Sequence, residues 1–565
     1  MIPSRRKFQT KVRALVIGGI WLLPVPICYA QSHGMAPPNE LDAVRNRLER
    51  QRLEENIQRQ LDEEKKRPVP ETSQRQGTAS EGGAAFLITK IIVIGDPEAS
   101  AARDKVLARY ENTRMGAGEM LALVRDLTNY YGQMGYVTTT VTLNRQNIKS
   151  GLLQVQVNWG QVQGWRIDGA PARTWRQRLL LATLPKTTGR KLNIRDIDQS
   201  VEILNGGLGA ATIDIVPAET LSYSYLNIAQ RRSKPWGFSV GLDNSGTGDH
   251  DAGRYRVNAE LMFKGAGSDF WGVSYGQRYF REGPDQEKNW SAYGTVPLGY
   301  WDFELRHTRS EYKRLIGGNF GRYLSSGRSE DNSLKVERVF GREQTGKYTF
   351  FARLAQRSNE NFIDGYRLDV NSRKYTDISL GLTRVGKLAG GVYYLDVAYG
   401  KGLSWLGAND TQPDVRGIRP ALYDKISGNF SWSRSWQGRA AFNYAARGGW
   451  QYGDGPLLAA NKMTLGDEFT VRGFKGGTVY GDSGAYLSNT LELPLAKGRL
   501  TPFVGFDLGV AKDRGRPSER LSGAVIGIRG QTAMTRWSLS YAKPVDRPKG
   551  YPDEAVVYMT ANLKF

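Results

Sequence analysis

An arginine and an aspartate near the C-terminus are the residues of this chain best suited to form a functional pair. Arg472 stands beside Gly473, between stretches in which apolar and polar residues alternate as they do in membrane β-strands. A guanidinium group that faced lipid would cost several kcal/mol, so it must point into a polar lumen. There it should meet a carboxylate, and Asp507 on a later alternating stretch is the clearest candidate.

The remaining residues give no sign of catalytic or metal chemistry. The chain has 1 cysteine, Cys28, and 3 histidines that are scattered along it. Removal of Cys28 with an N-terminal signal would exclude disulfides, thiolate metal sites and cysteine nucleophiles. Residues 265–267 (Gly-Ala-Gly) are expected to form a turn and not a phosphate loop, since no helix follows them. We therefore predict no catalytic residue, no metal site and no cofactor.

Residues 1–30 have the layout of a secretory signal peptide. Basic residues come before a short apolar run at 14–27, and Cys28-Tyr29-Ala30 then supplies a signal-peptidase site. The run is too short for a permanent membrane helix. Lipid attachment at Cys28 is the weaker interpretation, because Pro26-Ile27 lacks the small residues that usually precede such a cysteine. The mature chain is therefore expected to be exported.

The composition is typical of an outer-membrane β-barrel. The mean hydropathy is −0.48, yet the chain has 66 glycines, 28 tyrosines and 13 tryptophans. Such a barrel is hydrophilic overall because its lumen is polar and only one face of each strand meets lipid. The net charge of +22 does not indicate nucleic-acid binding in an exported protein. A cationic lumen, or contact with anionic lipopolysaccharide and acidic client segments, fits that charge better.

Residues 40–67 are predicted to form one highly charged helix, followed by a linker at 68–85. At 1.5 Å per residue the helix would be roughly 40 Å long, enough to cross a bilayer core of about 30 Å. Its apolar stripe is too thin for a buried core helix and too sparse for lipid. Two interpretations remain, namely a solvated helix or short coiled coil, and a polar plug in a water-filled barrel. The stripe consists of Leu41, Val44, Leu48, Leu53, Ile57 and Leu61.

Residues 86–163 and 164–232 are predicted to form two small α+β domains with partly repeated element order. In the first domain, strands are expected at 88–94, 137–143 and 152–157, and a helix at 120–134. In the second domain, strands are expected at 165–167, 211–216 and 221–228, and helices at 174–182 and 194–204.

From residue 236 to the C-terminus the pattern has a period of two, which predicts a transmembrane β-barrel. About 330 residues, at roughly 20 per strand and loop, give about 16 antiparallel strands, an even number as in bacterial barrels. A soluble sandwich would also alternate. It would not explain the aromatic residues concentrated on one face, or a chain that ends on a strand at Phe565.

The order of these parts resembles that of the two-partner secretion transporters, over nearly the whole mature chain. The soluble part is similar to tandem POTRA domains at residues 130–136, Gln146 and residues 151–153. Residues 242–246, where the barrel begins, are also typical of the family. The most specific element is 466–474 (Gly-Asp-Glu-Phe-Thr-Val-Arg-Gly-Phe), which resembles the lumen-loop motif of these transporters. The chain departs from the family pattern at Asn144, where the family often has proline, and at residues 217–218 (Pro-Ala), where proline-glycine is common. Both departures affect the expected geometry of loops and not the expected fold.

The resemblance implies a role for the motif. In the family its arginine lies at the tip of an extracellular loop folded into the pore, and it meets an aspartate on the inner wall. Residues 503–509 resemble that wall segment, and alternation independently puts Asp507 on the face opposite its apolar neighbours. An ordinary exposed arginine in an extracellular loop is the alternative. The implied site residues are Val471, Arg472, Gly473 and Phe474 in the loop, Asp507 and Glu492 on the wall, and Phe565 as C-terminal barrel signal.

The resemblance also implies a function. The periplasmic POTRA-like domains would recognise an unfolded exoprotein (a haemolysin, adhesin or contact-dependent inhibition toxin) with an N-terminal secretion domain, and the barrel would secrete it. Further implied partners are outer-membrane lipid, lipopolysaccharide and the barrel assembly machinery, with no nucleic acid. One rival is an assembly factor that inserts other barrels. A passive channel would not explain the periplasmic domains, and a barrel enzyme would need catalytic residues that the sequence does not present.

Overall fold

The computed structural model describes most of the chain. The predicted signal peptide, nearly all of the predicted linker, and Arg67 at the predicted end of the first helix lie outside the described residues. The described residues are 40–66, 85–96, 100–231, 234–245, 255–280, 285–318, 321–369, 372–409, 421–438, 441–475, 478–551 and 553–565.

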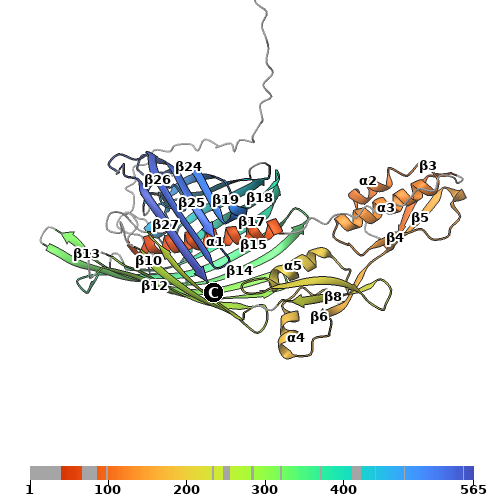
Figure 1. Ribbon diagram of the computed structural model, residues 1–565, viewed down its shortest axis with the longest axis horizontal. Coiled ribbons are helices and arrows are strands. Elements are labelled where there is room, and N and C mark those ends of the chain that lie inside the picture. The colour runs from red at the N-terminus through yellow and green to blue at the C-terminus, as the bar shows by residue number, and fades with distance from the viewer. Residues whose placement is uncertain are drawn as a thin grey trace, which may run out of the picture.

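The C-terminal part is a closed antiparallel barrel of 16 long strands, which confirms the predicted architecture (Figure 1). Consecutive strands pair along the chain, and the last pairs with the first. A two-residue strand, β16 (Tyr366–Arg367), only extends the hairpin between β15 and β17. The long strands are β9 (Trp236–Asp243), β10 (Arg256–Lys264), β11 (Phe270–Arg278), β12 (Gln286–Leu298), β13 (Trp301–Gly318), β14 (Gly321–Glu343), β15 (Gly346–Ile363), β17 (Arg373–Leu388), β18 (Gly391–Leu403), β19 (Asp424–Trp436), β20 (Phe442–Gly453), β23 (Ser483–Glu492), β24 (Leu500–Lys512), β25 (Glu519–Gln531), β26 (Thr535–Asp546) and β27 (Val556–Lys564).

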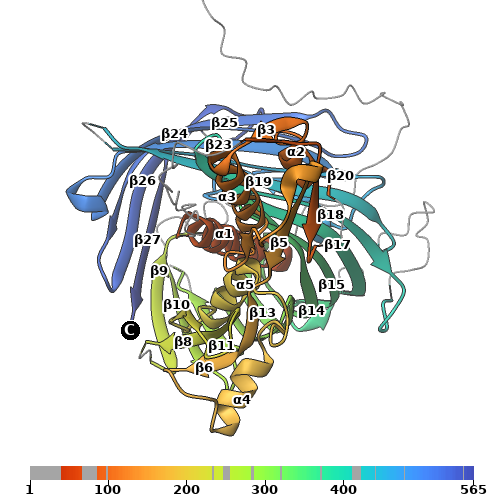
Figure 2. The ribbon, with the colours of Figure 1, turned by 90° about the vertical axis from the view of Figure 1, so that its right-hand side faces the viewer.

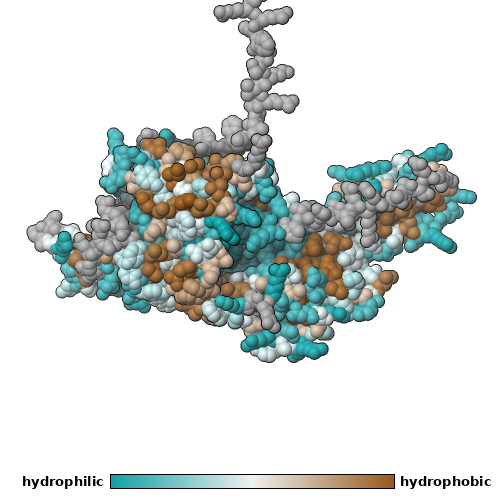
Figure 3. All heavy atoms as spheres, viewed as in Figure 1, coloured by the Kyte–Doolittle hydropathy of each residue, from teal (hydrophilic) through white to brown (hydrophobic). Residues whose placement is uncertain are grey.

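The strands alternate between lipid and lumen as their sequences require. On β24, Val504, Phe506 and Leu508 are 44–49% exposed on the outer face, whereas Asp507 between them is fully buried inside. Figure 3 shows hydrophobic side chains gathered on the outer face over β24 to β27. A polar residue is stable at every second position only because the lumen supplies polar partners.

The barrel closes where β27 meets β9, in a register that runs from Thr560↔Asp243 to Lys564↔Ser239. The last residue, Phe565, completes this seam. Its backbone N–H donates to the Phe238 carbonyl at 2.8 Å, and the two rings stack with centroids 6.0 Å apart.

The first α+β domain contains two small sheets, β1–β3 and β2-β5-β4. The predicted strand at 88–94 is in fact two strands divided at Thr89, and the strand predicted at 137–143 is only three residues long. Helix α2 was not predicted, because its seven residues are mostly polar or small and bury only Arg103 and Leu107. The elements are β1 (Phe86–Ile88), β2 (Lys90–Ile94), α2 (Ala101–Leu107), β3 (Thr113–Met115), α3 (Ala117–Gln133), β4 (Thr140–Thr142) and β5 (Leu152–Asn158).

The second α+β domain is one sheet in the order β6-β8-β7 with two helices. Strand β6 begins at Gln161, so the predicted boundary between residues 163 and 164 is wrong because it falls inside a strand. A shift in the pairing with β8 between Val162 and Gly164 breaks the alternation there, which concealed the start of the strand. The elements are β6 (Gln161–Ile167), α4 (Trp175–Ala182), α5 (Ile194–Leu204), β7 (Ala211–Pro217) and β8 (Tyr223–Gln230).

Helix α1 (Glu40–Lys66) lies inside the barrel, as the views from the side and along the barrel both show (Figures 1 and 2). It contacts β13, β14, β17 and β18 on the wall, and the short helix η4 (Ala459–Asn461) on a loop. Part of its thin apolar stripe is buried against the wall, because Ile57 and Leu61 pack on Val385, Val392 and Tyr394 of β17 and β18. In the described part of the chain, no helix is both long and apolar enough to cross a membrane.

Candidate functional site in the barrel lumen

The loop between β20 and β23 folds back against the inner wall of the barrel. It forms a hairpin of β21 (Met463–Leu465) and β22 (Val479–Gly481), which leaves the motif residues between its two strands. Apolar side chains attach this loop to the wall and are almost fully buried. The cluster contains Met463, Leu465, Val471, Phe474 and Val479 of the loop, Ala511 of β24 and Leu521 of β25.

The structure brings Arg472 and Asp507 together as a bidentate ion pair. Arg472 Nε lies 2.7 Å from Asp507 Oδ2, and Nη2 lies 2.7 Å from Oδ1. The backbone N–H of Arg472 also donates to Oδ2 at 2.9 Å. Asp507 is fully buried and Arg472 is 8% exposed. Two charges so removed from water are stable only when each is paired and hydrogen-bonded, and both conditions are met here.

Strand β23 completes the surroundings of the pair. Arg472 Nη2 donates to the Asn489 carbonyl at 3.0 Å and to Ser488 Oγ at 3.2 Å, while Ser488 Oγ donates to Asp507 Oδ1 at 2.8 Å. The guanidinium therefore contacts two neighbouring strands at once, and the position of the loop tip is fixed along and across the wall.

Gly473 allows the tip to approach the wall closely. Its φ of +109° belongs to the region that favours glycine, and a Cβ there would lie 2.8 Å from the Lys543 carbonyl carbon of β26. Its N–H donates to Tyr558 Oη on β27 at 3.2 Å, and Tyr558 in turn donates to the Phe474 carbonyl. The wall also needs a glycine at this contact, since a Cβ on Gly523 of β25 would lie 1.7 Å from the Arg472 carbonyl oxygen.

Glu492, the second carboxylate predicted for this site, does not contact Arg472. It is the last residue of β23, four residues along the strand from Ser488, a separation of roughly 13 Å at about 3.3 Å per residue. Its partner is Arg529 of β25. Alternation correctly indicated the face on which Glu492 lies, but it carries no information on position along the barrel axis.

Charged side chains of α1 tie the helix to several strands of the wall. Three ion pairs reach the well-separated strands β12, β15 and β20, so α1 is fixed to several parts of the wall at once. The sequence alone does not reveal these partners, although the density of charge on residues 40–66 is a signal that the helix has a charged environment. The pairs are Arg47–Glu287 at 2.5 Å on β12, Glu49–Arg357 at 2.9 Å on β15, and Glu54–Arg447 at 2.5 Å on β20.

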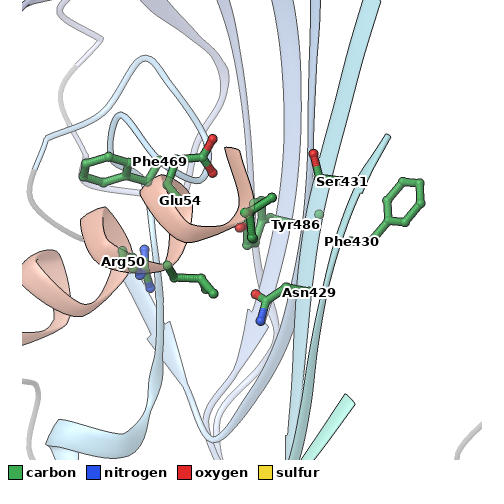
Figure 4. Close-up of a pocket in the computed structure, with 10 residues that line it drawn as sticks. Arg50, Glu54, Asn429, Phe430, Ser431, Phe469 and Tyr486 are labelled. Carbon is green, nitrogen blue, oxygen red and sulfur yellow. The ribbon is translucent and has the colours of Figure 1, made fainter. Parts of the chain in front are cut away.

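Helix α1 also contacts the inserted loop next to the motif. Arg50 Nη1 lies 2.9 Å from Asp467 Oδ2, and Arg50 donates to the Thr464 carbonyl. Asp467 orders the motif itself, because its other oxygen accepts the backbone N–H of Thr470 at 2.9 Å. A small cavity remains between helix, loop and wall, with Arg50, Phe469 and Tyr486 among its lining residues (Figure 4). Helix and loop thus form one polar assembly inside the barrel.

Two family models match the chain. The model described as haemolysin secretion/activation protein ShlB/FhaC/HecB matches residues 222–530, and the ShlB-type POTRA domain matches residues 86–160. The chain belongs to the ShlB/FhaC/HecB family. This confirms the resemblance drawn from the lumen-loop motif and the order of the domains. It also identifies the first α+β domain as a POTRA domain, ending directly before β6.

Relatives in this family align over most of the chain. An outer membrane transporter CdiB of Escherichia coli is 28% identical over 558 residues, 95% of this chain and 92% of the relative. The hemolysin transporter protein HpmB of Proteus mirabilis is 28% identical over 70% of each chain. The solved structure of a CdiB from Escherichia coli matches with a TM-score of 0.85 at 27% identity, over 94% of this chain and 100% of that one. This ShlB/FhaC/HecB protein is therefore an outer-membrane protein whose POTRA domains lie in the periplasm.

The second periplasmic domain docks on the periplasmic turns of the barrel through α5. Glu202 lies 2.5 Å from Arg342 Nη2 and also contacts Lys347, both beside the β14–β15 turn. Burial raises the pKa of the Glu202 carboxyl, but the nearby Lys347 and Arg342 outweigh it and hold that pKa well below its usual range. Gln199 adds a hydrogen bond to the Gly299 carbonyl at 3.1 Å in the β12–β13 turn.

Among the residues that the structure describes, no group of three or more His, Cys, Asp or Glu side chains is placed to hold a metal ion. The charged side chains of the lumen pair with one another across helix, loop and wall.

Proposed function

We propose that this chain is a two-partner secretion transporter that exports an unfolded exoprotein through its barrel. The observation that carries the proposal is the content of the lumen, which is filled by a polar helix and a polar loop. The helix is held mainly by ion pairs and hydrogen bonds, which water can replace when the helix leaves. Membership of the ShlB/FhaC/HecB family and the transporter names of CdiB and HpmB support the same function.

The periplasmic domains would capture the partner through its N-terminal secretion domain. Strand β2 is at the edge of the sheet β2-β5-β4, where an added strand would replace the Glu111 carboxylate that accepts the Ile91 N–H at 3.0 Å. A cavity lies beside this edge, lined by Ile91, Val93 and Leu107 with charged side chains around them. An extended segment could add backbone hydrogen bonds at the edge and place alternate side chains in the cavity.

Export would require α1 to leave the lumen while the inserted loop keeps its place. The two parts differ in the way they are held. The contacts of α1 with the wall are mainly polar, whereas the loop has an apolar cluster and the Arg472–Asp507 pair. We assign to that pair the task of holding the loop tip in its working position while a client segment passes. Folding of the client outside the cell would favour outward movement.

The proposal also includes partners in the membrane and in barrel assembly. The outer face of the barrel would meet membrane lipid and lipopolysaccharide, and the barrel assembly machinery would insert the chain through a C-terminal strand that ends at Phe565. The contact of Phe565 with Phe238 at the seam supports a role for this residue in closing the barrel.

Deletion of the gene separates this function from its rivals. A transporter predicts that one large exoprotein, encoded beside this gene, disappears from the medium while other outer-membrane proteins stay at normal levels. Normal secretion of that exoprotein would refute the proposal. A general loss of barrel proteins would instead support the assembly factor, and a change in small-solute uptake alone would support a passive channel.

A further inference from the structure

Helix α4 of the second periplasmic domain carries an exposed surface that the transport function does not use. Trp175 is 60% exposed and Leu179 is 42% exposed, on the same face of the helix one turn apart. The arginines Arg173, Arg176 and Arg178 surround them and are all exposed. A tryptophan and a leucine among three cations form a surface with both apolar and positive character. We call these five residues the α4 surface.

The barrel itself fixes the position of α4. Thr183, directly after α4, donates to Ser268 Oγ at 3.1 Å in the β10–β11 turn. Its carbonyl accepts the N–H of Gly299 at 2.8 Å in the β12–β13 turn. A Cβ on Gly267 would lie 3.5 Å from Leu179 Cγ. Thr183, Leu179 and Trp175 follow one another at intervals of four, so one helical stripe begins at the periplasmic rim and runs away from it.

The stripe runs outward, away from the lumen. Figure 2 shows α4 at the bottom edge of the molecule, far from α1 at the centre of the barrel, and Figure 1 places it beside the periplasmic end of the strands. Hydrophilic side chains cover this region in Figure 3. The α4 surface therefore lies next to the membrane surface that surrounds the barrel on its periplasmic side.

The barrel rim marks the level of the lipid headgroups independently. Trp236, Trp271 and Trp301 lie at the periplasmic ends of β9, β11 and β13 and are 38–45% exposed. Tryptophan collects at this depth because its ring is amphipathic. Two of the three carry a cation over the ring, with Lys234 5.2 Å from the ring centroid of Trp236 and Arg338 5.0 Å from that of Trp301.

The α4 surface repeats this arrangement outside the barrel. Arg176 lies 5.4 Å from the ring centroid of Trp175, as the rim cations lie over theirs. We propose that the α4 surface binds the anionic phospholipid headgroups of the periplasmic leaflet, with Trp175 in the interface and the three arginines on the phosphates. The second POTRA-like domain would then be held at the membrane by lipid as well as by the barrel turns. Each arginine should raise affinity for an anionic surface by about fivefold.

The test is a measurement of depth at position 175 in the mature protein with all of its domains. The only cysteine lies at position 28, in the predicted signal peptide, so a nitroxide can be attached to a Trp175→Cys variant alone. The protein is placed in nanodiscs of phosphatidylethanolamine with phosphatidylglycerol, or of phosphatidylcholine only. We expect the label to become several-fold less accessible to a water-soluble nickel relaxation agent, and more accessible to oxygen, in the anionic discs.

Two controls make the result specific. A label at Leu221→Cys, 91% exposed in the same domain at the end of the sheet far from the barrel, should stay accessible in both lipids. Adding Arg173→Gln, Arg176→Gln and Arg178→Gln should remove the lipid effect at position 175. The matched triple variant Arg109→Gln, Arg114→Gln and Arg125→Gln, on the first domain, should keep it.

Equal accessibility at position 175 in the two lipids would overturn the proposal and leave the α4 surface to a protein such as the exported partner. A lipid effect that survives the triple substitution on α4 would also overturn it, because the arginines would then not bind the headgroups. If the triple variant fails to insert, the proposal is still tested by the variant that keeps its three arginines, whose label is compared between the two kinds of nanodisc.

Discussion

At the scale of single residues, the lumen illustrates how buried charge specifies position. Arg472 donates to Asp507 through both its side chain and its backbone, and it adds bonds to the neighbouring strand β23. Planar guanidinium and carboxylate groups fit each other in one orientation, which a lysine cannot reproduce. A pair of this kind has value as a fixed attachment point for a loop.

Replacing Arg472 should therefore separate loop anchoring from barrel assembly. In an Arg472→Ala variant, Asp507 is left buried without its partner, a cost of about 3–5 kcal/mol in comparable sites. Because the loop tip lies inside an already closed barrel, we expect this cost to release the tip and not to prevent insertion. Secretion of the partner into the medium should fall at least tenfold, while heat-modifiable migration of the folded barrel on gels stays unchanged.

Arg529→Ala provides the matched control for this experiment. Arg529 is another partly buried cation on the inner wall, and its partner Glu492 is away from the loop tip. That variant should lose far less secretion than Arg472→Ala. Equal effects of the two substitutions, or unchanged export with Arg472→Ala, would remove the assigned role of the pair.

At the scale of elements, two helices meet the barrel in different ways. Helix α1 fills the lumen through ion pairs spread over several strands, whereas α5 joins the second periplasmic domain to the β14–β15 turn through Glu202. The first contact must break if the lumen is to open. The second can persist, so that a captured client stays at the entrance.

Removal of residues 40–66 should open the lumen. We expect a variant that lacks them to give a larger conductance in planar bilayers than the intact chain, because α1 and its counter-charges no longer fill the pore. As a control, Lys65→Gln with Lys66→Gln changes only the exposed end of the helix and should leave the conductance as it was. An unchanged current after the deletion would mean that the inserted loop alone closes the barrel.

Loss of the Glu202 charge should loosen the docking of the second periplasmic domain. Glu202→Gln leaves Arg342 and Lys347 without their carboxylate, at a cost of about 1–2 kcal/mol for this partly exposed group. Hydrogen exchange in α5 and in the β14–β15 turn should become faster, whereas Glu219→Gln, at an exposed carboxylate of the same domain, should have no effect. If Glu202→Gln leaves the protection from hydrogen exchange unchanged, the hydrogen bond of Gln199 and the contacts with the turns are sufficient to hold the domain on the barrel.

The ion pairs of Glu202 should make the docking of the second periplasmic domain depend on pH. Since the folded pKa of Glu202 is held below its ordinary value of 4.5, the pair stabilises docking fully above that pH, and the stabilisation is lost as pH falls toward the depressed pKa. The protection measured by exchange should therefore be constant from neutral pH down to about 5 and decline only in stronger acid. Glu202→Gln should abolish this decline.

At the scale of the whole molecule, the sequence predicts structure best where an element lies between two different environments. There, apolar and polar residues must repeat with the period of that element. Alternation predicted the 16-strand barrel because one strand face meets lipid and the other meets polar groups. It also placed Asp507 on the polar face of its strand, whereas its pairing with Arg472 was expected from charge complementarity and from the resemblance of the motif to the family. Alternation could not show that Glu492 faces Arg529, because position along the axis depends on how far each strand is staggered against the next. The partners of α1 depend on that stagger as well, and so stayed unidentified.

The arrangement of helix, loop and wall leads to a prediction for the whole transporter, namely that α1 must move for export to occur. Leu53 on α1 and Ser431 on β19 line the same cavity, and the predicted mature chain has no cysteine of its own. In a Leu53→Cys, Ser431→Cys variant, a reducible bis-methanethiosulfonate reagent should tether the helix to the wall. Secretion should stop after treatment and return after reduction, since the lumen is then free to open. The Leu53→Cys variant treated in the same way should keep secreting, and continued export by the tethered double variant would show that a client can pass with α1 in place.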